Sequence, residues 1–420
     1  MGFYMKNNDL SRRKFLQSSS FGAVSVLIPS IKTGYTRNKM KGMEREGKIP
    51  GNISKWDIDT PALLLDMDAF ERNLKKMSEY CRKNDIPFRP HTKTHKSPII
   101  SKMQVSYGAI GICTAKVSEA EVMVKGGIGD ILITSPVVSS YKIKRMMELR
   151  KQTSGLMVVL DNPRNIQDLS NASASNKLKL DVLVDVNPPG MDRTGIQPGR
   201  PAVELAKTVL KSEGLRFRGI QAYAGNMQHV RGFNERRKRN LKCMEAAAET
   251  KRMMEKEGIE VEIFSGGGTG TYNIDNYVPG LTDVQVGSYI FMDVQYLAIG
   301  GKDFSDDYYG DFEPSLTVLT TAISQPVKGR ITTDAGIKSF AMDGPKPVLK
   351  DITGVSYGIR GDEHGEIRLE NPSRKVKIGD KVEAIVPHCD PTVNLYDCYY
   401  CVRNEKVEAI WDVSGRGKSQ

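Results

Sequence analysis

The sequence predicts an α/β fold: a (β/α)₈ barrel of the TIM type followed by a C-terminal β domain. Its 420 residues, 39% of them hydrophobic, suffice for one large domain and a smaller one. From about residue 60 to residue 293, short apolar runs alternate with helical stretches. After residue 311 the pattern changes to β-rich runs separated by turn residues, among them SLTVLTTAIS and KVEAIVP. This change places the domain boundary near residue 310.

The alternating region contains about eight strand candidates, most of which are followed by a helical stretch. Continuous apolar strands that alternate with helices indicate a parallel sheet covered on its outer face. Eight such units suggest a closed barrel, in which polar residues at the carboxyl ends of the strands form the site. The candidates are 62–67, 108–114, 130–136, 155–161, 180–187, 218–226, 260–268 and 283–293.

The excess of positive charge lies at the N-terminus. Residues 1–48 hold ten Lys or Arg against three Asp or Glu, whereas the other 372 residues hold 51 against 47. A nearly neutral body argues against a nucleic-acid partner. The segment SRRKFLQ and the short apolar run FGAVSVLI after it are typical of a twin-arginine signal. That run is far below the ~20 residues of a spanning helix, so we expect no stable membrane insertion.

Export to the periplasm is therefore the expected localisation. The alternative is a basic tail on a cytoplasmic enzyme. The whole chain is then divided into a signal segment, a linker with a lead-in strand, the barrel, and the β domain. The expected boundaries are 1–35, 36–58, 59–310 and 311–420.

Six cysteines are scattered without the spacing of a disulfide framework. The pair in CYYC, Cys398 and Cys401, is compatible with a zinc or redox site. The run is strand-like, however, and an offset of three places the two thiols on opposite faces of a strand. We expect ordinary strand packing.

The segment RPHTKTHKSP (89–98) concentrates five basic side chains. If it is extended, Arg89, His91, Lys93 and His95 share one face, and burying them requires an anion or an acceptor network. Neighbouring positive charge and partial desolvation lower the pKa of a lysine. Lys93 is therefore a candidate nucleophilic amine, suited to a Schiff base with an aldehyde. The alternative is a metal bound by His91 and His95 on a helix, which Pro90 makes doubtful.

Two further segments carry candidate ligands. SGGGTGT (265–271) ends a predicted strand, and consecutive glycines let backbone N–H groups converge on a phosphate; otherwise it is a simple turn. PHCDPTVNLYD (387–397) places His388 and Asp390 two residues apart. In an extended segment both would face one cation such as Mn²⁺ or Zn²⁺, and Cys389 would point away. The alternative is a turn capped by Asp-Pro.

The order of these motifs resembles the D-threonine aldolase and D-serine dehydratase family of fold-type III pyridoxal-phosphate enzymes, typified by alanine racemase. The resemblance runs from about residue 57 to residue 415. It rests on DTPALLLD, RPHTKTHK, GICTAKVSEAE, VDVNPPGMDRTGI, IQAYAGNMQH, SGGGTGT, VGSYIFMD and HCDPTVNLYD. It implies the barrel with a C-terminal β domain, and a homodimer with shared active sites.

The resemblance also implies roles for individual residues. Lys93 would form the Schiff base with pyridoxal 5'-phosphate, Arg193 would contact the phenolate oxygen of the cofactor, and Tyr223 would line the ring pocket. The backbone of Gly267, Gly268 and Thr269 would hold the phosphate. Gln285 and Ser288 would contact the ring edge or the phosphate, and His388 with Asp390 would bind the divalent metal.

The activity that the resemblance implies is cleavage of a D-3-hydroxy amino acid to glycine and an aldehyde. The family's dehydratases place Cys two residues after the metal-binding His, and its aldolases place Asp there, as in His388-Cys389-Asp390. His91, or a metal-bound water, is the candidate base that removes the hydroxyl proton. The alternatives are a D-serine dehydratase-like ammonia-lyase and, more remotely, a pyridoxal-phosphate carrier without catalysis.

Overall fold

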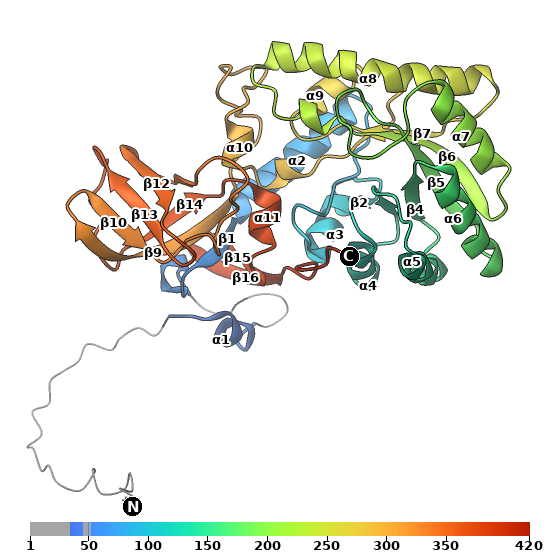
Figure 1. The fold of residues 1–420 in the computed structure, drawn as a ribbon. Coiled ribbons are helices and arrows are strands. Elements are labelled where there is room, and N and C mark those ends of the chain that lie inside the picture. The colour runs from blue at the N-terminus through green and yellow to red at the C-terminus, as the bar shows by residue number, and fades with distance from the viewer. Residues whose placement is uncertain (1–33, 45–48, 50–51) are drawn as a thin grey trace, which may run out of the picture. The chain divides into compact units, whose positions relative to one another are not determined.

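The computed structural model describes residues 34–44, 49 and 52–420 (Figure 1). Nearly all of the predicted signal segment, residues 1–33, lies outside these ranges. Within them, no helix is long and apolar enough to cross a membrane.

A seven-stranded parallel sheet forms the barrel domain, with its strands in chain order. The strands are short and apolar, and most of their side chains are buried on both faces, as expected for a sheet enclosed by helices. They are β2 (Ile112–Thr114), β3 (Ile131–Ile133), β4 (Leu156–Leu160), β5 (Leu180–Asp185), β6 (Leu215–Ala222), β7 (Ile263–Gly266) and β8 (Asp283–Val284).

The segment Phe88–His91 closes the barrel between β8 and β2. Phe88 forms a parallel bridge with Val284, and His91 forms one with Cys113. The Arg89 N–H donates to the carbonyl of Val284 at 2.9 Å, and the Cys113 N–H donates to the carbonyl of Pro90 at 2.8 Å. The predicted eightfold barrel is thus confirmed, and its eighth position is held by the start of the basic motif.

Helices cover the outer face of the barrel sheet, and their apolar sides form one continuous core with it (Figure 1). Local signals fix several starts. Asp66 caps the helix that begins at Met67, and Asn162 caps the helix that begins at Pro163. The α-helices are α2 (Met67–Lys83), α3 (Pro98–Ser106), α4 (Val117–Lys125), α5 (Ser140–Gln152), α6 (Pro163–Ser175), α7 (Arg200–Leu210), α8 (Phe233–Lys256), α9 (Tyr272–Asp275) and α10 (Val294–Leu297). Two 3₁₀ turns, η2 (Gly225–Met227) and η3 (Ser288–Ile290), follow β6 and β8.

The C-terminal domain is built on a nine-stranded sheet of order β12-β13-β10-β9-β1-β15-β16, with β14 pairing with β9 and β11 with β14. A short helix, α11 (Cys389–Val393), lies between β14 and β15. The strands from the C-terminal part of the chain are β9 (Leu316–Val327), β10 (Arg330–Thr333), β11 (Val348–Leu349), β12 (Val355–Ile359), β13 (Gly365–Leu369), β14 (Lys381–Ile385), β15 (Cys398–Arg403) and β16 (Lys406–Asp412).

The strand β1 (Ala62–Asp66) belongs to this C-terminal sheet. It pairs antiparallel with β9 and parallel with β15. The prediction that 62–67 is the first barrel strand is therefore wrong. An apolar run of this length fits the middle of either sheet, and its sequence does not say which.

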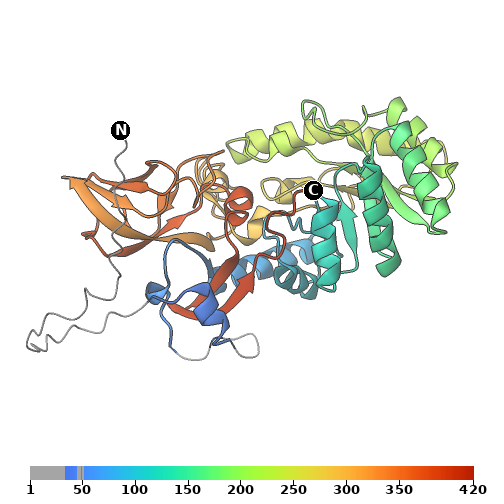
Figure 2. The ribbon, with the colours of Figure 1, turned by 60° about the horizontal axis from the view of Figure 1, so that its bottom comes forward.

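The segment before β1 also joins the C-terminal domain (Figure 2). It forms a helix, α1 (Arg37–Lys41), and a 3₁₀ turn, η1 (Lys55–Asp57), where a lead-in strand was expected. The Ile49 N–H donates to the carbonyl of Glu408, and the Lys55 N–H donates to that of Glu405. The order of domains along the chain is thus interleaved.

All six cysteines are unpaired and buried. Cys398 and Cys401 lie on β15, and their side chains enter two different apolar clusters. This confirms the expectation of ordinary strand packing on opposite faces.

Because β1 is an internal strand of the C-terminal sheet, truncating its core side chains should destabilise the whole chain. Leu65 is fully buried. We expect Leu65→Ala to lower the free energy of unfolding by about 2 to 5 kcal/mol, measured by urea denaturation. Ile323→Ala on β9 is the control, because Ile323 is 41% exposed. Equal midpoints for the two variants would contradict the assignment of β1 to a buried central position.

Candidate active site

The basic motif is extended only as far as His91. From Thr92 to His95 the chain turns: the His95 N–H donates to the Thr92 carbonyl at 3.2 Å, and the Lys96 N–H donates to the same oxygen at 2.7 Å. The expectation that Arg89, His91, Lys93 and His95 share one face therefore fails beyond His91. The turn separates the side chains and sends each to a different partner.

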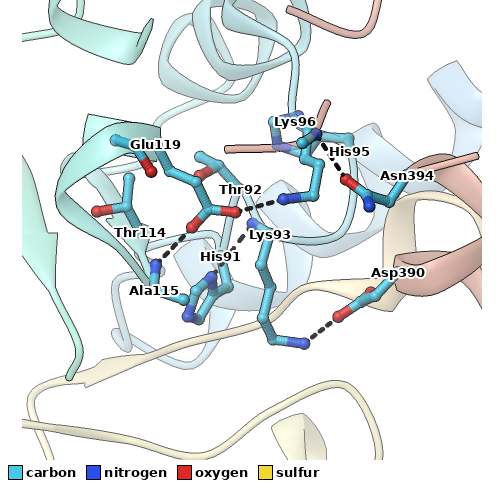
Figure 3. Close-up of polar contacts among 12 residues, drawn as sticks. His91, Thr92, Lys93, His95, Lys96, Thr114, Ala115, Glu119, Asp390 and Asn394 are labelled. Carbon is cyan, nitrogen blue, oxygen red and sulfur yellow. Dashed lines mark hydrogen bonds and ion pairs between the residues drawn. The ribbon is translucent and has the colours of Figure 1, made fainter. Parts of the chain in front are cut away.

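Three of the cations each have a carboxylate of their own. Arg89 lies 3.7 Å from Asp283 inside the barrel, and Lys96 pairs with Glu119 at 2.6 Å. The Lys93 ammonium forms an ion pair with Asp390 (Figure 3). The cost of crowding and burying positive charge is thus offset by separate anions, contributed by β8, α4 and α11.

The two histidines of the motif do not converge on one metal. The Nε2 atom of His91 lies 3.1 Å from Thr134 Oγ1, and its Nδ1 atom accepts from the Lys93 N–H at 3.3 Å. The ring of His95 is buried, with Nε2 at 3.2 Å from Gln104 Oε1. Burial lowers the pKa of His95 to about 3 and holds the pKa of His91 well below its usual value.

Lys93 and Asp390 come from opposite ends of the chain. The Lys93 side chain is 42% exposed, whereas that of Asp390 is 16% exposed and its Oδ1 atom is buried without a hydrogen bond among the described residues. Burial alone would lower the pKa of Lys93, but the Asp390 carboxylate outweighs it and raises that pKa. The lowered pKa expected from the neighbouring cations is not found. The reason is the Asp390 carboxylate, which lies close to Lys93 in the fold but far from it in the sequence.

His388 and Asp390 flank the start of α11. His388 is the N-cap residue and Asp390 lies in the first helical turn, so the segment is not extended as expected. The charge of Lys93, followed by that of His388, lowers the pKa of Asp390 against the effect of burial. His388 Nδ1 is 2.8 Å from Asp343 Oδ2. The Cys389 thiol is buried and donates to the Met292 carbonyl, so it points away as predicted.

Arg193 follows the carboxyl end of β5, and Tyr223 follows the carboxyl end of β6. Arg193 lies in the loop after β5, and its guanidinium carbon is 5.5 Å from the centre of the Tyr223 ring. Burial raises the pKa of Tyr223, and the positive charges of Lys93 and Arg193 oppose this. The structure thus brings Lys93, Arg193, Tyr223 and Asp390 into one electrostatic neighbourhood.

The glycine turn after β7 is a tight backbone structure. Gly267 has φ +68°, and a Cβ there would come within 2.2 Å of Asp275 Oδ2. A Cβ on Gly268 would come within 2.6 Å of Gln228 Oε1. Thr269 is held through its Oγ1 atom, which accepts from the Tyr289 N–H at 3.0 Å. Glycine is therefore required where the turn approaches its own supports.

Gln285 and Ser288 lie beside this turn. The Nε2 group of Gln285 donates to Gln221 Oε1 at 3.1 Å and to Ser265 Oγ at 2.9 Å. The Gln221 amide donates in turn to Asp185 Oδ1 at 2.9 Å. Ser288 begins η3 and is buried. Both Gln285 protons are thus used inside the barrel.

His229 is a residue that the sequence analysis did not single out. It is exposed, and its ring lies 4.4 Å from the Tyr296 ring. Desolvation, followed by the charges of His388 and Lys93, lowers its pKa to about 4. The available signal was its position at the end of IQAYAGNMQH, a polar residue just beyond a barrel strand.

Two protein families match successive parts of the chain. The alanine racemase N-terminal domain family matches residues 65–295, and the serine dehydratase domain family matches residues 315–402. The chain is 38% identical to the 3-hydroxy-D-aspartate aldolase of Paracoccus denitrificans (strain Pd 1222), over 88% of this chain and 95% of that protein. The D-threo-3-hydroxyaspartate dehydratase of Delftia sp. (strain HT23) is 26% identical, over 74% of this chain and 79% of that protein.

Among solved structures, the D-threonine aldolase of Filomicrobium marinum superposes with a TM-score of 0.83 at 38% identity, over 88% of this chain and 98% of that one. A parallel barrel with a lysine at its mouth and a β domain beside it defines a class of cofactor-dependent enzymes. The chain belongs to the fold-type III pyridoxal-phosphate family, with an alanine racemase N-terminal domain and a serine dehydratase domain.

The residues present fit this cofactor. Lys93 offers an accessible amine, and the turn at 267–269 is a glycine backbone held close to Asp275 and Gln228, with no room for side chains at Gly267 and Gly268. Fewer side chains are available to bind a divalent metal than to bind the cofactor. No group of three or more His, Cys, Asp or Glu side chains is arranged for a metal within the described ranges. His388 and Asp390 supply one nitrogen and one carboxylate, and the unpartnered Asp390 Oδ1 is free to take a cation.

The buried carboxyl of Asp275 makes the folding stability of the chain depend on pH. It is fully buried beneath the glycine turn, where it accepts from Asn240 at 2.8 Å, from Thr271 at 2.6 Å and from the Gly268 N–H. Burial raises its pKa to about 7. The unfolded chain releases this proton near pH 4, so from about pH 4 to pH 7 ionisation favours the unfolded state. Stability is lost as the pH rises through this window.

We therefore expect Asp275→Asn to stabilise the chain more at pH 8 than at pH 5, by about 2 to 3 kcal/mol. Urea denaturation at the two pH values measures the difference. Asp303→Asn is the control, because Asp303 is exposed. The same change in stability at both pH values would mean that Asp275 is ionised throughout.

Proposed function

We propose that the chain is a pyridoxal-phosphate- and divalent-metal-dependent lyase that cleaves D-3-hydroxy amino acids to glycine and an aldehyde. The observation that carries the proposal is the meeting of Lys93 with Asp390, which comes two residues after His388. It puts an amine that can hold an aldehyde next to a carboxylate that can hold a cation. The aldolase relatives support the same reaction class.

The cofactor would be held by residues that follow five strand positions of the barrel. Lys93 would bind its aldehyde carbon, Arg193 its phenolate oxygen, and the Tyr223 ring would line its pocket. The backbone of Gly267 and Thr269 would hold its phosphate, with Gln285 and Ser288 beside it. The Gly268 N–H, which was also expected there, donates to the Asp275 carboxylate. When bound, pyridoxal phosphate supplies an electron sink for the electron pair that cleavage leaves on Cα of the amino acid.

The metal would be bound by His388 and Asp390, most suitably Mn²⁺ or Zn²⁺. It would supply a Lewis acid next to the 3-hydroxyl of the substrate. The position of Cys389 favours the aldolase ligand pair, because its thiol donates to Met292 inside the protein and does not face this site. The donor two residues after the histidine is the carboxylate of Asp390.

The proton of the substrate hydroxyl must be removed before the C–C bond breaks. Both ring nitrogens of His91, the base expected from the sequence, are engaged by Thr134 and the Lys93 N–H. His229 is exposed. Its pKa is lowered by desolvation and by the charges of His388 and Lys93, so the ring is neutral at pH 7. We therefore assign proton removal to His229 and a positioning role to His91. Lys93 returns a proton to Cα, which completes glycine.

Two expectations from the sequence stand as proposals. A homodimer with shared active sites, acting on small amino acids, fits the family. Export to the periplasm rests on the twin-arginine pattern within residues 1–33. Sedimentation of the purified chain and fractionation of cells that express it are the corresponding measurements.

Incubation with D-threonine and Mn²⁺ should release acetaldehyde and glycine in equal amounts, and a chelator should abolish the reaction. Lys93→Ala should lose at least ~10³-fold in rate, because the amine that holds the cofactor is absent. Lys102→Ala is the matched control, an exposed lysine on α3. Release of 2-oxobutanoate and ammonia would establish the dehydratase alternative, and a panel of D-3-hydroxy amino acids would define the substrate.

The assignment of the base predicts different failures for the two histidines. His229→Asn should lower kcat by about 10² to 10⁴-fold while the cofactor absorbance is retained. His91→Asn should weaken cofactor retention, because it breaks the hydrogen bonds that shape the Lys93 turn. Spectra and steady-state rates of both variants separate these effects. A kcat unchanged in His229→Asn would return the role of base to His91.

A further inference from the structure

Arg236 of α8 is a fully buried cation with an unusual set of partners. Its guanidinium donates to four backbone carbonyls: those of Gly270 at 2.7 Å, Val230 at 2.9 Å, Ile299 at 2.8 Å and Gly300 at 2.6 Å. Among the described residues, no carboxylate oxygen lies within 4.0 Å of it. The nearby Asp311 carboxylate instead accepts from Tyr272 at 3.1 Å and Asn273 at 3.2 Å.

A buried charge without a counter-ion is costly, so it requires an explanation. Other buried or half-buried arginines of this chain follow the usual rule, for example Arg218, which pairs with Asp181 at 2.8 Å. Burial lowers the pKa of Arg236, although the Asp311 carboxylate opposes this shift. The guanidinium carbon also lies 5.6 Å from the centre of the Tyr309 ring and 5.9 Å from that of the Phe233 ring. A site that receives an anion from solution would complete its neutralisation.

The partners of Arg236 connect it to the glycine turn. Three successive carbonyls of this turn are directed to donors within the protein. Gly268 O accepts from the Thr271 N–H at 3.1 Å, Thr269 O accepts from the Tyr309 hydroxyl at 2.8 Å, and Gly270 O accepts from Arg236. Carbonyl oxygens repel a phosphate, so a turn that binds phosphate through N–H groups must direct its carbonyls elsewhere.

Arg236 also joins the turn to the other loops at this end of the barrel. Val230 lies in the loop after η2, and Ile299 and Gly300 follow α10. The Arg236 side chain thus links three loops. It places its positive charge at the carbonyl of Gly270, the residue after Thr269. Asp275 also contacts this turn: its carboxyl lies against Gly267 and would oppose an anion when ionised.

We propose that Arg236 is a positioning residue of the phosphate site, which makes the apoprotein select the phosphorylated cofactor over its dephosphorylated form. It holds the Gly270 carbonyl away from the phosphate and supplies the positive charge that the glycine turn lacks. The inference rests on the proposed function, in which the turn at 267–269 binds the phosphate of the cofactor.

The test compares two ligands that differ only in the phosphate. The full chain is freed of cofactor, and the dissociation constants of pyridoxal 5'-phosphate and pyridoxal are measured by absorbance titration. The readout is the ratio of the two constants. We expect Arg236→Met to reduce this preference at least tenfold, and Arg236→Lys, which keeps the charge, to reduce it less. The ³¹P shift of bound cofactor should change in both variants.

Arg145→Met is the control, because Arg145 pairs with Glu121 on the outer helices. It should leave the ratio unchanged. If Arg236→Met does not fold, Arg236→Gln removes the charge while keeping one donor, and the same tenfold loss is expected. A merely structural role would weaken both ligands equally, and an unchanged ratio in Arg236→Met or Arg236→Gln would overturn the proposal.

The outcomes that would refute the proposed reaction differ from those that would refute the role of Arg236. If the wild-type chain prefers the phosphorylated ligand but cleaves no D-3-hydroxy amino acid, the reaction is wrong and the role of Arg236 stands. If the wild-type chain binds both ligands equally, the turn does not bind phosphate and the role of Arg236 is refuted.

Discussion

The ion pair between Lys93 and Asp390 is the contact on which the candidate site depends. The two residues lie 297 positions apart, one at the closing segment of the barrel and one at the start of α11 in the C-terminal domain. Neither domain alone contains both the amine and the carboxylate. The packing of the two domains therefore determines the geometry of the site. The strand β1 contributes to that packing through Leu63 and Leu65, which belong to the same apolar cluster as Val284 of the barrel.

The cations of the basic motif at the barrel mouth follow one rule, from which the buried Arg236 departs. Arg89, Lys93 and Lys96 are each matched with an acid, which makes a crowded basic motif compatible with burial. Arg236 instead contacts backbone carbonyls and the Phe233 and Tyr309 rings, with no ion pair among the described residues. An exception of this kind marks a place where the protein keeps charge available, and it lies directly behind the turn that the cofactor's phosphate would occupy.

Much of this could be predicted from the sequence. The alternation of apolar runs and helices defined the barrel, and the motif residues Lys93, Arg193, Tyr223 and Asp390 do converge. The assignment of 62–67 failed because an apolar strand carries no information about which sheet it joins. The shared face of the basic motif failed because the turn at Thr92–His95 depends on hydrogen bonds that residue types alone do not specify. His229 and Arg236 were missed because an exposed histidine and a helical arginine look ordinary until their neighbours are known.

The position of β1 has a consequence for synthesis on the ribosome. This strand is among the first to emerge, yet its antiparallel partner β9 begins 250 residues later, at Leu316. At about 5 to 20 residues per second, that interval is roughly 10 to 50 seconds. During it, an apolar strand with two unsatisfied edges waits in the nascent chain. A chaperone that holds the emerging N-terminal region would protect it from premature pairing until β9 arrives.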